Sequence, residues 1–133
     1  MEQMKKFFKK DKFANHVGIE LLAASEGSAR ARMEISDHHL NAVGIVHGAA
    51  IFALADLVFA MASNSHGRVA VAINANISFL KAASHGTLFA EAKEVSRNSK
   101  LATYTISVTD ENDDLVASFQ GMVYRKKDKI DME

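Results

Sequence analysis

The stretch from His47 to Asn64 constrains the fold of this chain more than any other feature of the sequence. It is rich in helix-forming residues, and apolar side chains would occupy nearly every face of the helix. A helix that is apolar all round has to be buried on most sides. Its apolar run, residues 49–62, is too short to span a bilayer and carries Asp56 at its middle. We therefore expect a buried helix inside a folded domain.

Six other segments show the alternation of apolar and polar residues that is typical of half-buried antiparallel strands. They are residues 18–24, 28–35, 69–80, 87–95, 101–109 and 115–124. In the third segment, the odd-numbered residues from Val69 to Phe79 are expected to share one face of the sheet. One helix among five or six such strands is buried on most sides only if the sheet wraps around it.

The length of 133 residues fits a single α+β domain over 1–133, with a basic and acidic tail at 126–133. Within 1–16, Met4, Phe7 and Phe8 share one face of a short amphipathic helix. Two roles are open for that helix. It anchors the protein at a membrane surface or, as we prefer, it docks on the domain through these side chains.

The composition excludes several classes of function. The chain has no cysteine, which rules out thiol nucleophiles, disulfides and thiolate metal sites. Sixteen basic and sixteen acidic residues balance, so there is no general attraction to nucleic acid. His38 and His39 are adjacent without a third ligand at suitable spacing, and the acidic turn at 110–114 lacks the glycine of a calcium loop. We expect no metal, no cofactor, no membrane partner and a cytoplasmic location.

The strongest candidates for chemistry lie on the long helix. Asp56 stands between Ala55 and Leu57, and burying an uncompensated carboxylate costs several kcal/mol. From the residues alone, two interpretations stay open: a structural aspartate, or a nucleophile or general base with a raised pKa. Gly48, at the helix entrance, would let a ligand approach first-turn N–H groups that have no partner in the helix. A carboxylate and oxyanion donors on one helix are the parts that acyl transfer or ester-type hydrolysis needs.

The segment NAVGIVHGAAIFALAD, Asn41 to Asp56, resembles the signature of the PaaI-like acyl-CoA thioesterases of the hotdog fold. That family has Asn, a Gly three positions on, then His-Gly-Gly and Leu-Ala-Asp. The similarity continues through FAMASNSHG and VAVAINANISFLKAA and covers roughly residues 15–125. It implies a hotdog fold, in which an antiparallel sheet of five to six strands wraps around one long central helix.

The resemblance implies a role for each matching residue. Asp56 would attack the thioester or activate water, and the backbone N–H of Gly48 would polarise the thioester carbonyl. Asn41 would help to hold the nucleophile or water, and His47 would orient the loop. One departure is Ala49, which stands where the family has a second glycine.

The resemblance also implies substrate or CoA contacts at Ala49, Asn74, Arg97 and Lys100. Arg97 and Lys100, in the turn sequence SRNSK, would lie near the nucleotide end of CoA, whose phosphates need cations. A solvated turn is an equally open interpretation. A second departure is Lys81-Ala82, which replaces the Arg-Pro or similar pair usual after the third strand.

We therefore predict an acyl-CoA thioesterase that releases free acid and CoA from an aryl or a short- or medium-chain thioester. Open sheet edges favour a dimer, and the resemblance implies a homodimer or homotetramer. Gly48 and Asp56 are eight residues apart, ~12 Å along a helix, so we expect each active site to be shared between two subunits. One alternative is an acyl-CoA-binding or sensing module without turnover. A hotdog hydratase or dehydratase would need a paired Asp and His, and the Asn–Gly–Asp spacing argues against it.

Overall fold

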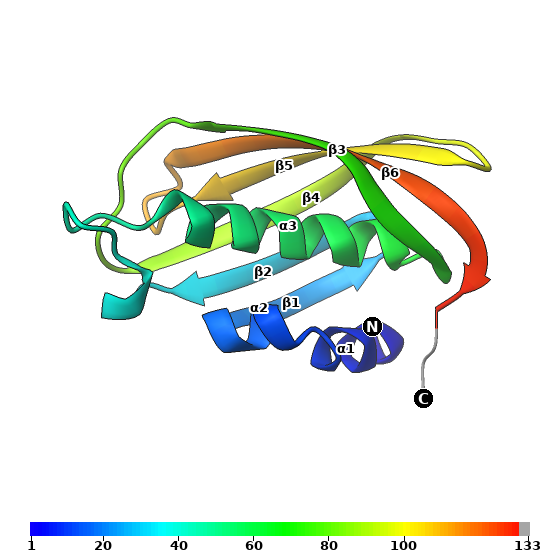
Figure 1. The fold of residues 1–133 in the computed structure, drawn as a ribbon, viewed down its shortest axis with the longest axis horizontal. Coiled ribbons are helices and arrows are strands. Elements are labelled where there is room, and N and C mark those ends of the chain that lie inside the picture. Colours follow the sequence, from blue (N-terminus) through cyan, green and yellow to red (C-terminus); the bar gives the residue numbers. More distant parts are fainter. Residues whose placement is uncertain (131–133) are drawn as a thin grey trace.

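A computed structural model describes residues 1–130 of the chain as one antiparallel sheet wrapped around one long helix (Figure 1). The elements in chain order are α1 (Glu2–Lys9), α2 (Lys12–Val17), β1 (Ile19–Ser25), β2 (Ser28–Glu34), the 3-10 turn η1 (Asp37–His39), α3 (Gly48–Asn64), β3 (Arg68–Phe79), β4 (Thr87–Arg97), β5 (Leu101–Thr109) and β6 (Leu115–Lys129). The six strands pair in the order β1-β2-β4-β5-β6-β3. The predicted architecture, an antiparallel sheet of five to six strands wrapped around a central helix, is confirmed, and the sheet has six strands.

Helix α3 is buried in the sheet on all but one face. Leu54, Val58 and Phe59 on the sheet side are at most 1% exposed, because they pack into the concave surface of the strands. The Phe59 ring contacts Tyr104 of β5 and Phe119 of β6, with ring centroids 5.8 and 5.5 Å apart. The opposite face carries Ala49, Phe52 and Asp56, which are open to a cavity. The apolar pattern thus predicted the burial of α3, but one face stays accessible.

Strand β3 departs from the expected pattern. A bulge between Ala72 and Asn74 inserts Ile73 as an extra residue opposite β6. Before the bulge Ala72 pairs with Val123, and after it Ile77 pairs with Phe119, so the residues facing α3 change from even to odd numbers. The prediction that all odd residues from Val69 to Phe79 share one face is therefore wrong. A one-residue insertion reverses every side chain beyond it.

Strand β3 is also an open edge of the sheet. Within the described chain no strand pairs with its outer side, and Val71, Ile73 and Phe79 are all exposed. The other edge strand, β1, packs against α1 and α2 (Figure 1). The two edges therefore differ, because one is flanked by helices and the other presents unpaired backbone groups and apolar side chains.

The N-terminal segment forms two short helices, where one was expected over 1–16. Asp11 breaks the segment, because its backbone is not helical and its carboxylate accepts a hydrogen bond from Ala14 N at 2.9 Å, which starts α2. Met4 is buried, and Phe7 and Phe8 pack against the core. This arrangement agrees with the preferred role, a segment that docks on the domain. The apolar face that these three side chains share is covered by the rest of the protein.

The chain beyond Arg125 is part of the sheet rather than a tail. Strand β6 runs to Lys129, which pairs with Arg68 of β3, and Ile130 N donates to Gly67 O at 3.0 Å. The last part of the expected tail, 131–133, lies outside the described residues. No helix within residues 1–130 is long and apolar enough to cross a membrane.

Candidate active site

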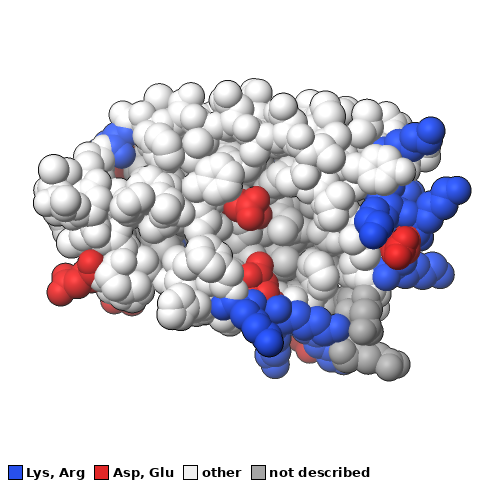
Figure 2. Space-filling model, in the orientation of Figure 1, with Lys and Arg blue, Asp and Glu red and all other residues white. Residues whose placement is uncertain are grey.

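A cavity of about 660 Å³ lies along the open face of α3. Its lining residues are Asp11, Phe13, Ala14, Gly48, Ala49, Phe52, Ala53, Asp56, Leu57 and Phe79. Apart from the two aspartates, every one of these is glycine or an apolar residue. In Figure 2 one acidic side chain stands in the white centre of this face, and a second lies below it, beside Lys and Arg side chains at the lower edge. The cavity can therefore hold an apolar group beside a carboxylate.

Asp56 reaches the cavity because it follows Ala49 and Phe52 along one side of α3. Its side chain is open to the cavity, yet the surrounding apolar groups displace much of its water. This burial raises the pKa of the Asp56 carboxyl above its ordinary value, and the nearby negative charge of Asp11 raises the pKa further. No basic residue lines the cavity to oppose these two effects. The carboxylate is accordingly more basic than an exposed one.

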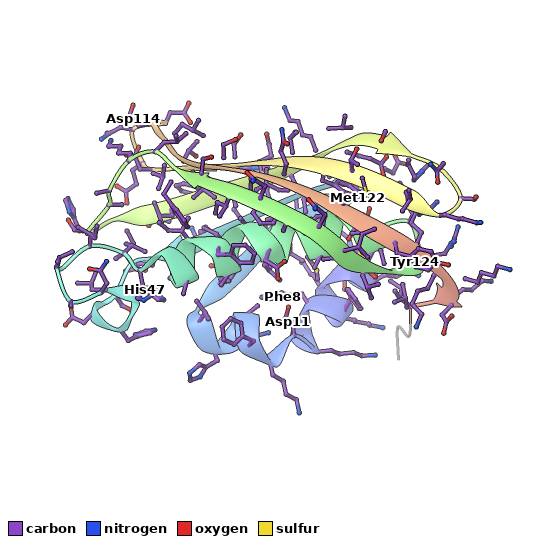
Figure 3. All side chains as sticks on the ribbon, turned by 45° about the horizontal axis from the view of Figure 1, so that its top comes forward. Phe8, Asp11, His47, Asp114, Met122 and Tyr124 are labelled. Carbon is purple, nitrogen blue, oxygen red and sulfur yellow. The ribbon has the colours of Figure 1, made fainter. Side chains whose placement is uncertain are left out.

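Gly48 lies at the first position of α3, and His47 caps the helix. His47 Nδ1 accepts a hydrogen bond from Ala49 N at 2.9 Å, and His47 O accepts from Ala50 N at 2.9 Å. The Gly48 N–H donates to no acceptor within residues 1–130, so it is available to a ligand at the positive end of the helix dipole. Figure 3 shows His47 at the start of α3.

The ring of Phe79 lies close to Gly48 and favours a small residue at this position. A Cβ added there would lie 3.2 Å from Phe79 Cζ, so the ring would have to move. The structure thus brings Gly48, Ala49 and Asp56 to one cavity, as the sequence predicted. Along the axis of a single helix, however, Gly48 and Asp56 remain ~12 Å apart.

Asn41 organises the loop that leads into α3. Its Oδ1 accepts hydrogen bonds from Val43 N at 3.0 Å and Ile45 N at 3.3 Å, and Leu40 forms a bridge with Val46 across the loop. Asn41 is not among the residues that line the Asp56 cavity of its own chain. Its Nδ2 group donates to no acceptor within the described residues, and so it could still hold a water or a carboxylate.

Asn74 is not brought to this cavity either. It lies just after the bulge of β3 and pairs with Met122. Together with Thr103, Thr105 and Gln120 it lines a separate hollow of about 260 Å³ on the sheet. The bulge determines this position, because it puts Asn74 on the face opposite Ala72, which would otherwise share its face.

Arg97 and Lys100 lie at the far end of α3 from Gly48. Arg97 ends β4 and contacts the imidazole of His66, which follows the helix, and its guanidinium is 4.0 Å from Glu94. The Lys100 side chain is exposed in the turn between β4 and β5. The structure therefore does not bring these two cations to the Asp56 cavity of the same chain, and neither of them lines it.

Two further arginines hold this turn in place. Arg68 Nη2 donates to Ser99 O at 2.9 Å, and Arg125 Nη1 donates to Asn98 O at 2.8 Å. The pKa of the Arg125 guanidinium is lowered, mainly by burial and also by the nearby positive charges of Arg68 and Arg97. Lys126, Lys127 and Lys129 follow at the end of β6. Figure 2 shows Lys and Arg side chains gathered at the right-hand end of the molecule, where β6 ends in Figure 1, and we call this the basic end. The sequence indicated the tail cations, but not Arg68.

Sequence reasoning also missed Asp11, Phe13, Phe52 and Phe79 as cavity residues. For Phe52 the signal was available, because it lies four positions before Asp56 on the same helical side. The other three come from elements whose packing against α3 no local pattern reveals.

The fold and the comparisons define a class of protein. A single antiparallel sheet wrapped around one long helix is the arrangement of the hotdog fold. The family model for the thioesterase superfamily matches residues 43–117, and the chain belongs to this superfamily. The predicted enzyme class, a thioester hydrolase, is confirmed at this level.

Individual relatives agree. A protein from Archaeoglobus fulgidus is 44% identical over 127 residues, covering 94% of this chain and 82% of the relative. The acyl-coenzyme A thioesterase PaaI of Escherichia coli is 34% identical over 119 residues, covering 89% of this chain and 85% of the relative. The solved structure of E. coli PaaI, from the phenylacetic acid degradation operon, matches with a TM-score of 0.92 and 30% identity, covering 98% of this chain and 97% of that one. The resemblance to PaaI-like hotdog thioesterases is confirmed.

Proposed function

We propose that this protein hydrolyses acyl-CoA thioesters to a free acid and CoA. The observation that carries the proposal is that α3 exposes two complementary groups to its cavity, the Asp56 carboxylate and the available N–H of Gly48. The name of the E. coli relative, an acyl-coenzyme A thioesterase, supports the same substrate class. The aromatic walls formed by Phe13, Phe52 and Phe79 suit an aryl or a short- or medium-chain acyl group.

The two groups have complementary roles in the proposed reaction. Asp56 attacks the carbonyl carbon to form a mixed anhydride that water then hydrolyses, or it takes a proton from a water that attacks the same carbon. In either route the carbonyl oxygen becomes an oxyanion, to which the N–H of Gly48 donates. The C–S bond then breaks, and CoA leaves as a thiolate that is protonated by solvent. Both routes require Asp56 to be ionised, and a higher pKa makes its carboxylate a stronger base and nucleophile.

We propose further that each active site is built from two chains. A carbonyl under attack lies ~3 Å from both the oxyanion donor and the nucleophile, which a separation of ~12 Å on one helix does not allow. The open edge of β3, with Val71 and Ile73 exposed, supports pairing of β3 with the same strand of a second copy. Such a pair would place Gly48 of one chain beside Asp56 of the other, with Asn41 from the preceding loop.

The nucleotide end of CoA is assigned to the basic end of the molecule. Arg97 and Lys100 supply the cations, and Arg68 and Arg125 fix the turn that carries Lys100. Guanidinium and ammonium groups are the side chains that bind phosphate oxygens. A pantetheine arm that runs along the helix would connect this end with the catalytic groups.

The experiment that tests the activity uses a panel of aryl-, short- and medium-chain acyl-CoAs with a thiol-detecting reagent. Release of free thiol that depends on Asp56 is the expected result. Tight binding without thiol release would instead identify an acyl-CoA sensor, and addition of water to an enoyl-CoA would identify a hydratase. Either of these outcomes would overturn the proposal.

A further inference from the structure

Asp11 places a second carboxylate on the wall of the Asp56 cavity. The two residues come from different elements, since Asp11 precedes α2 and Asp56 lies in the middle of α3. Figure 3 shows Asp11 and Phe8 on the side of the N-terminal helices that faces α3. In the sequence, Asp11 is only one charge in a lysine-rich segment, and nothing there connects it with the catalytic helix.

Its position is fixed by the way in which the N-terminal segment folds. Asp11 Oδ1 accepts from Ala14 N at 2.9 Å, and Asp11 O accepts from Asn15 Nδ2 at 2.7 Å. Ala14, which also lines the cavity, is 3% exposed. At the other end of α2, His39 Nε2 donates to Val17 O at 2.6 Å. The Asp11 carboxylate is therefore held at the cavity and cannot swing into bulk solvent without breaking the cap.

Few charged or titratable groups of the described chain lie near Asp56. On the side of α2, Asp11, which caps that helix, is the charged residue that lines the cavity, and His16 lines a neighbouring hollow instead. From α3, the only other titratable group near the cavity is His47, whose ring nitrogen caps the helix two turns from Asp56. From β3 the cavity receives only the ring of Phe79, and no Lys or Arg lines it. Asp11 is thus the one formal charge that faces Asp56 across the cavity of the described chain.

We propose that Asp11 is a positioning residue for the hydrolysis, whose fixed negative charge keeps Asp56 basic enough to attack the thioester or to take a proton from water. This proposal rests on the proposed function of Asp56. Asp11 would touch neither the substrate nor the reacting atoms, and it acts only through the Asp56 carboxylate.

The physical reason is the repulsion between two like charges on one cavity wall. A negative charge close to a carboxylate disfavours its ionised form and so raises its affinity for a proton. No cation lines the cavity to offset this repulsion. A general base or nucleophile with a higher proton affinity reacts faster once it is ionised. A raised pKa of Asp56 also means that, as the pH is lowered, activity begins to fall at a higher pH.

The test separates the charge of Asp11 from its role as a helix cap. Asp11→Asn removes the charge and keeps the cap, because Asn caps helices as well as Asp does. Asp11→Glu keeps the charge and weakens the cap. The pH profile of kcat/KM for acyl-CoA hydrolysis is measured for both variants and for the wild type, between pH 4 and 8.

For Asp11→Asn we expect the acidic limb to move to lower pH. Its activity relative to the wild type then rises as the pH falls, while on the plateau it drops by up to about tenfold. Asp11→Glu should keep the wild-type limb. The matched control is Asp113→Asn, which makes the same charge change at a left-handed turn position that Asn tolerates, and it should leave the profile unchanged.

A purely structural Asp11 would give a different result. Loss of the cap would lower kcat/KM by the same factor at every pH. Asp11→Glu would then lower kcat/KM more than Asp11→Asn does. That pattern, or an acidic limb of Asp11→Asn that coincides with the wild type, would overturn the proposal.

A second readout does not depend on turnover. The carboxyl carbon of Asp56 is titrated by NMR in the wild type and in Asp11→Asn, with Asp56→Asn to assign the signal. We expect the Asp56 pKa to decrease when Asp11 is neutralised. If the wild type released no thiol but the Asp56 titration shifted, the proposed function would fail and the electrostatic link would stand. An unmoved titration would reject the link whatever the activity.

Discussion

Phe59 on α3 packs so closely over Gly121 on β6 that a Cβ at position 121 would lie 2.5 Å from the ring carbon Cζ. Phe59 is 1% exposed and also contacts Tyr104 and Phe119, so its ring cannot move aside easily. The missing side chain on β6 is what lets the central helix lie against the sheet at this point. It thereby determines how α3, and with it the open face that carries Asp56, is placed.

The first prediction concerns this contact. Gly121→Ala should lower the free energy of unfolding by about 1–3 kcal/mol, because the added methyl group overpacks a rigid aromatic cluster. Urea denaturation would measure the loss. The control is Gly121→Ala combined with Phe59→Leu, in which the smaller side chain leaves room for the methyl group. The double variant should be less destabilised than the sum of the two single variants, and strict additivity would contradict the contact.

The second prediction concerns Glu94, which is held by two hydrogen bonds at the end of β4. Burial raises the pKa of Glu94. The hydrogen bonds from Tyr104 OH and His66 Nε2, both 2.8 Å, act together with electrostatic attraction from His66 and Arg97 to hold the pKa below its ordinary value. A lowered pKa contributes stability that is present above the unfolded value near pH 4.5 and is lost as the pH falls through the folded value.

Glu94→Gln should therefore cost about 1–2 kcal/mol of stability at pH 7 and less at pH 3.5, so that the acid side of its stability profile is flatter. Denaturation at several pH values would measure this. Glu91→Gln, which removes an exposed carboxylate of the same strand, is the matched control and should change stability by less than about 0.5 kcal/mol. Parallel profiles for the wild type and Glu94→Gln would contradict the assignment.

The third prediction concerns the reaction itself. Asp56→Asn keeps the shape of the side chain and removes its charge, so kcat should fall by about 10²-fold or more. The binding of a non-hydrolysable thioether analogue of the substrate, measured by calorimetry, should survive. Activity of the wild type should decline on the acid side, at a pH above that of an ordinary carboxyl, because burial and Asp11 raise the pKa of Asp56. If turnover were unchanged in Asp56→Asn, the Asp56 carboxylate would have no role in the reaction.

The fourth prediction tests the basic end. Lys100→Ala and Arg97→Ala should raise the KM for CoA esters more than the KM for pantetheine esters, because only CoA carries the phosphates that these cations would meet. The expected factor is about 3- to 10-fold for each variant. Lys9→Ala, which removes a cation from α1, should affect neither substrate class. If both kinds of ester lost equal affinity, the turn would be a solvated one, as the sequence alone left open.

The parts of this protein that the sequence predicted are those in which one local pattern decides the structure. The alternation in 28–35 and the apolar run of 49–62 identified strand and helix, because burial of one face follows directly from their periods. Asp56 was noticeable because a charge interrupts an apolar helix. In each case the signal and the structure lie in the same short segment.

The parts that were not predicted depend on contacts between segments. The bulge at Ile73 follows from pairing with β6, and it moved Asn74 to the other face. Asp11 meets Asp56 only because two short helices fold back on α3, and a cap at position 11 looks the same in sequence whether or not a cavity faces it. Arg68 likewise reaches Ser99 from a distant strand.

The last prediction is that a working site takes Gly48 from one chain and Asp56 from its partner. Gly48→Pro removes the N–H at the first helical position, where proline is tolerated, and the extended backbone of His47 fits a following proline. Gly48→Ala keeps the N–H and adds the same Cβ beside Phe79, so it controls for steric effects. Gly48→Pro and Asp56→Ala should each be inactive alone, and Gly48→Ala should retain most of the activity.

When the two inactive variants are refolded together, about half of the dimers are mixed by random assembly. A mixed dimer has one site with both lesions and one site with neither if the groups come from different chains. Activity should therefore return to roughly a quarter of the wild-type value. If both groups served the site of their own chain, every site would carry one lesion and the mixture would stay inactive. Inactivity despite mixed dimers, demonstrated by mass spectrometry, would reject the shared site, because the ~12 Å between Gly48 and Asp56 would then have to be closed within one chain.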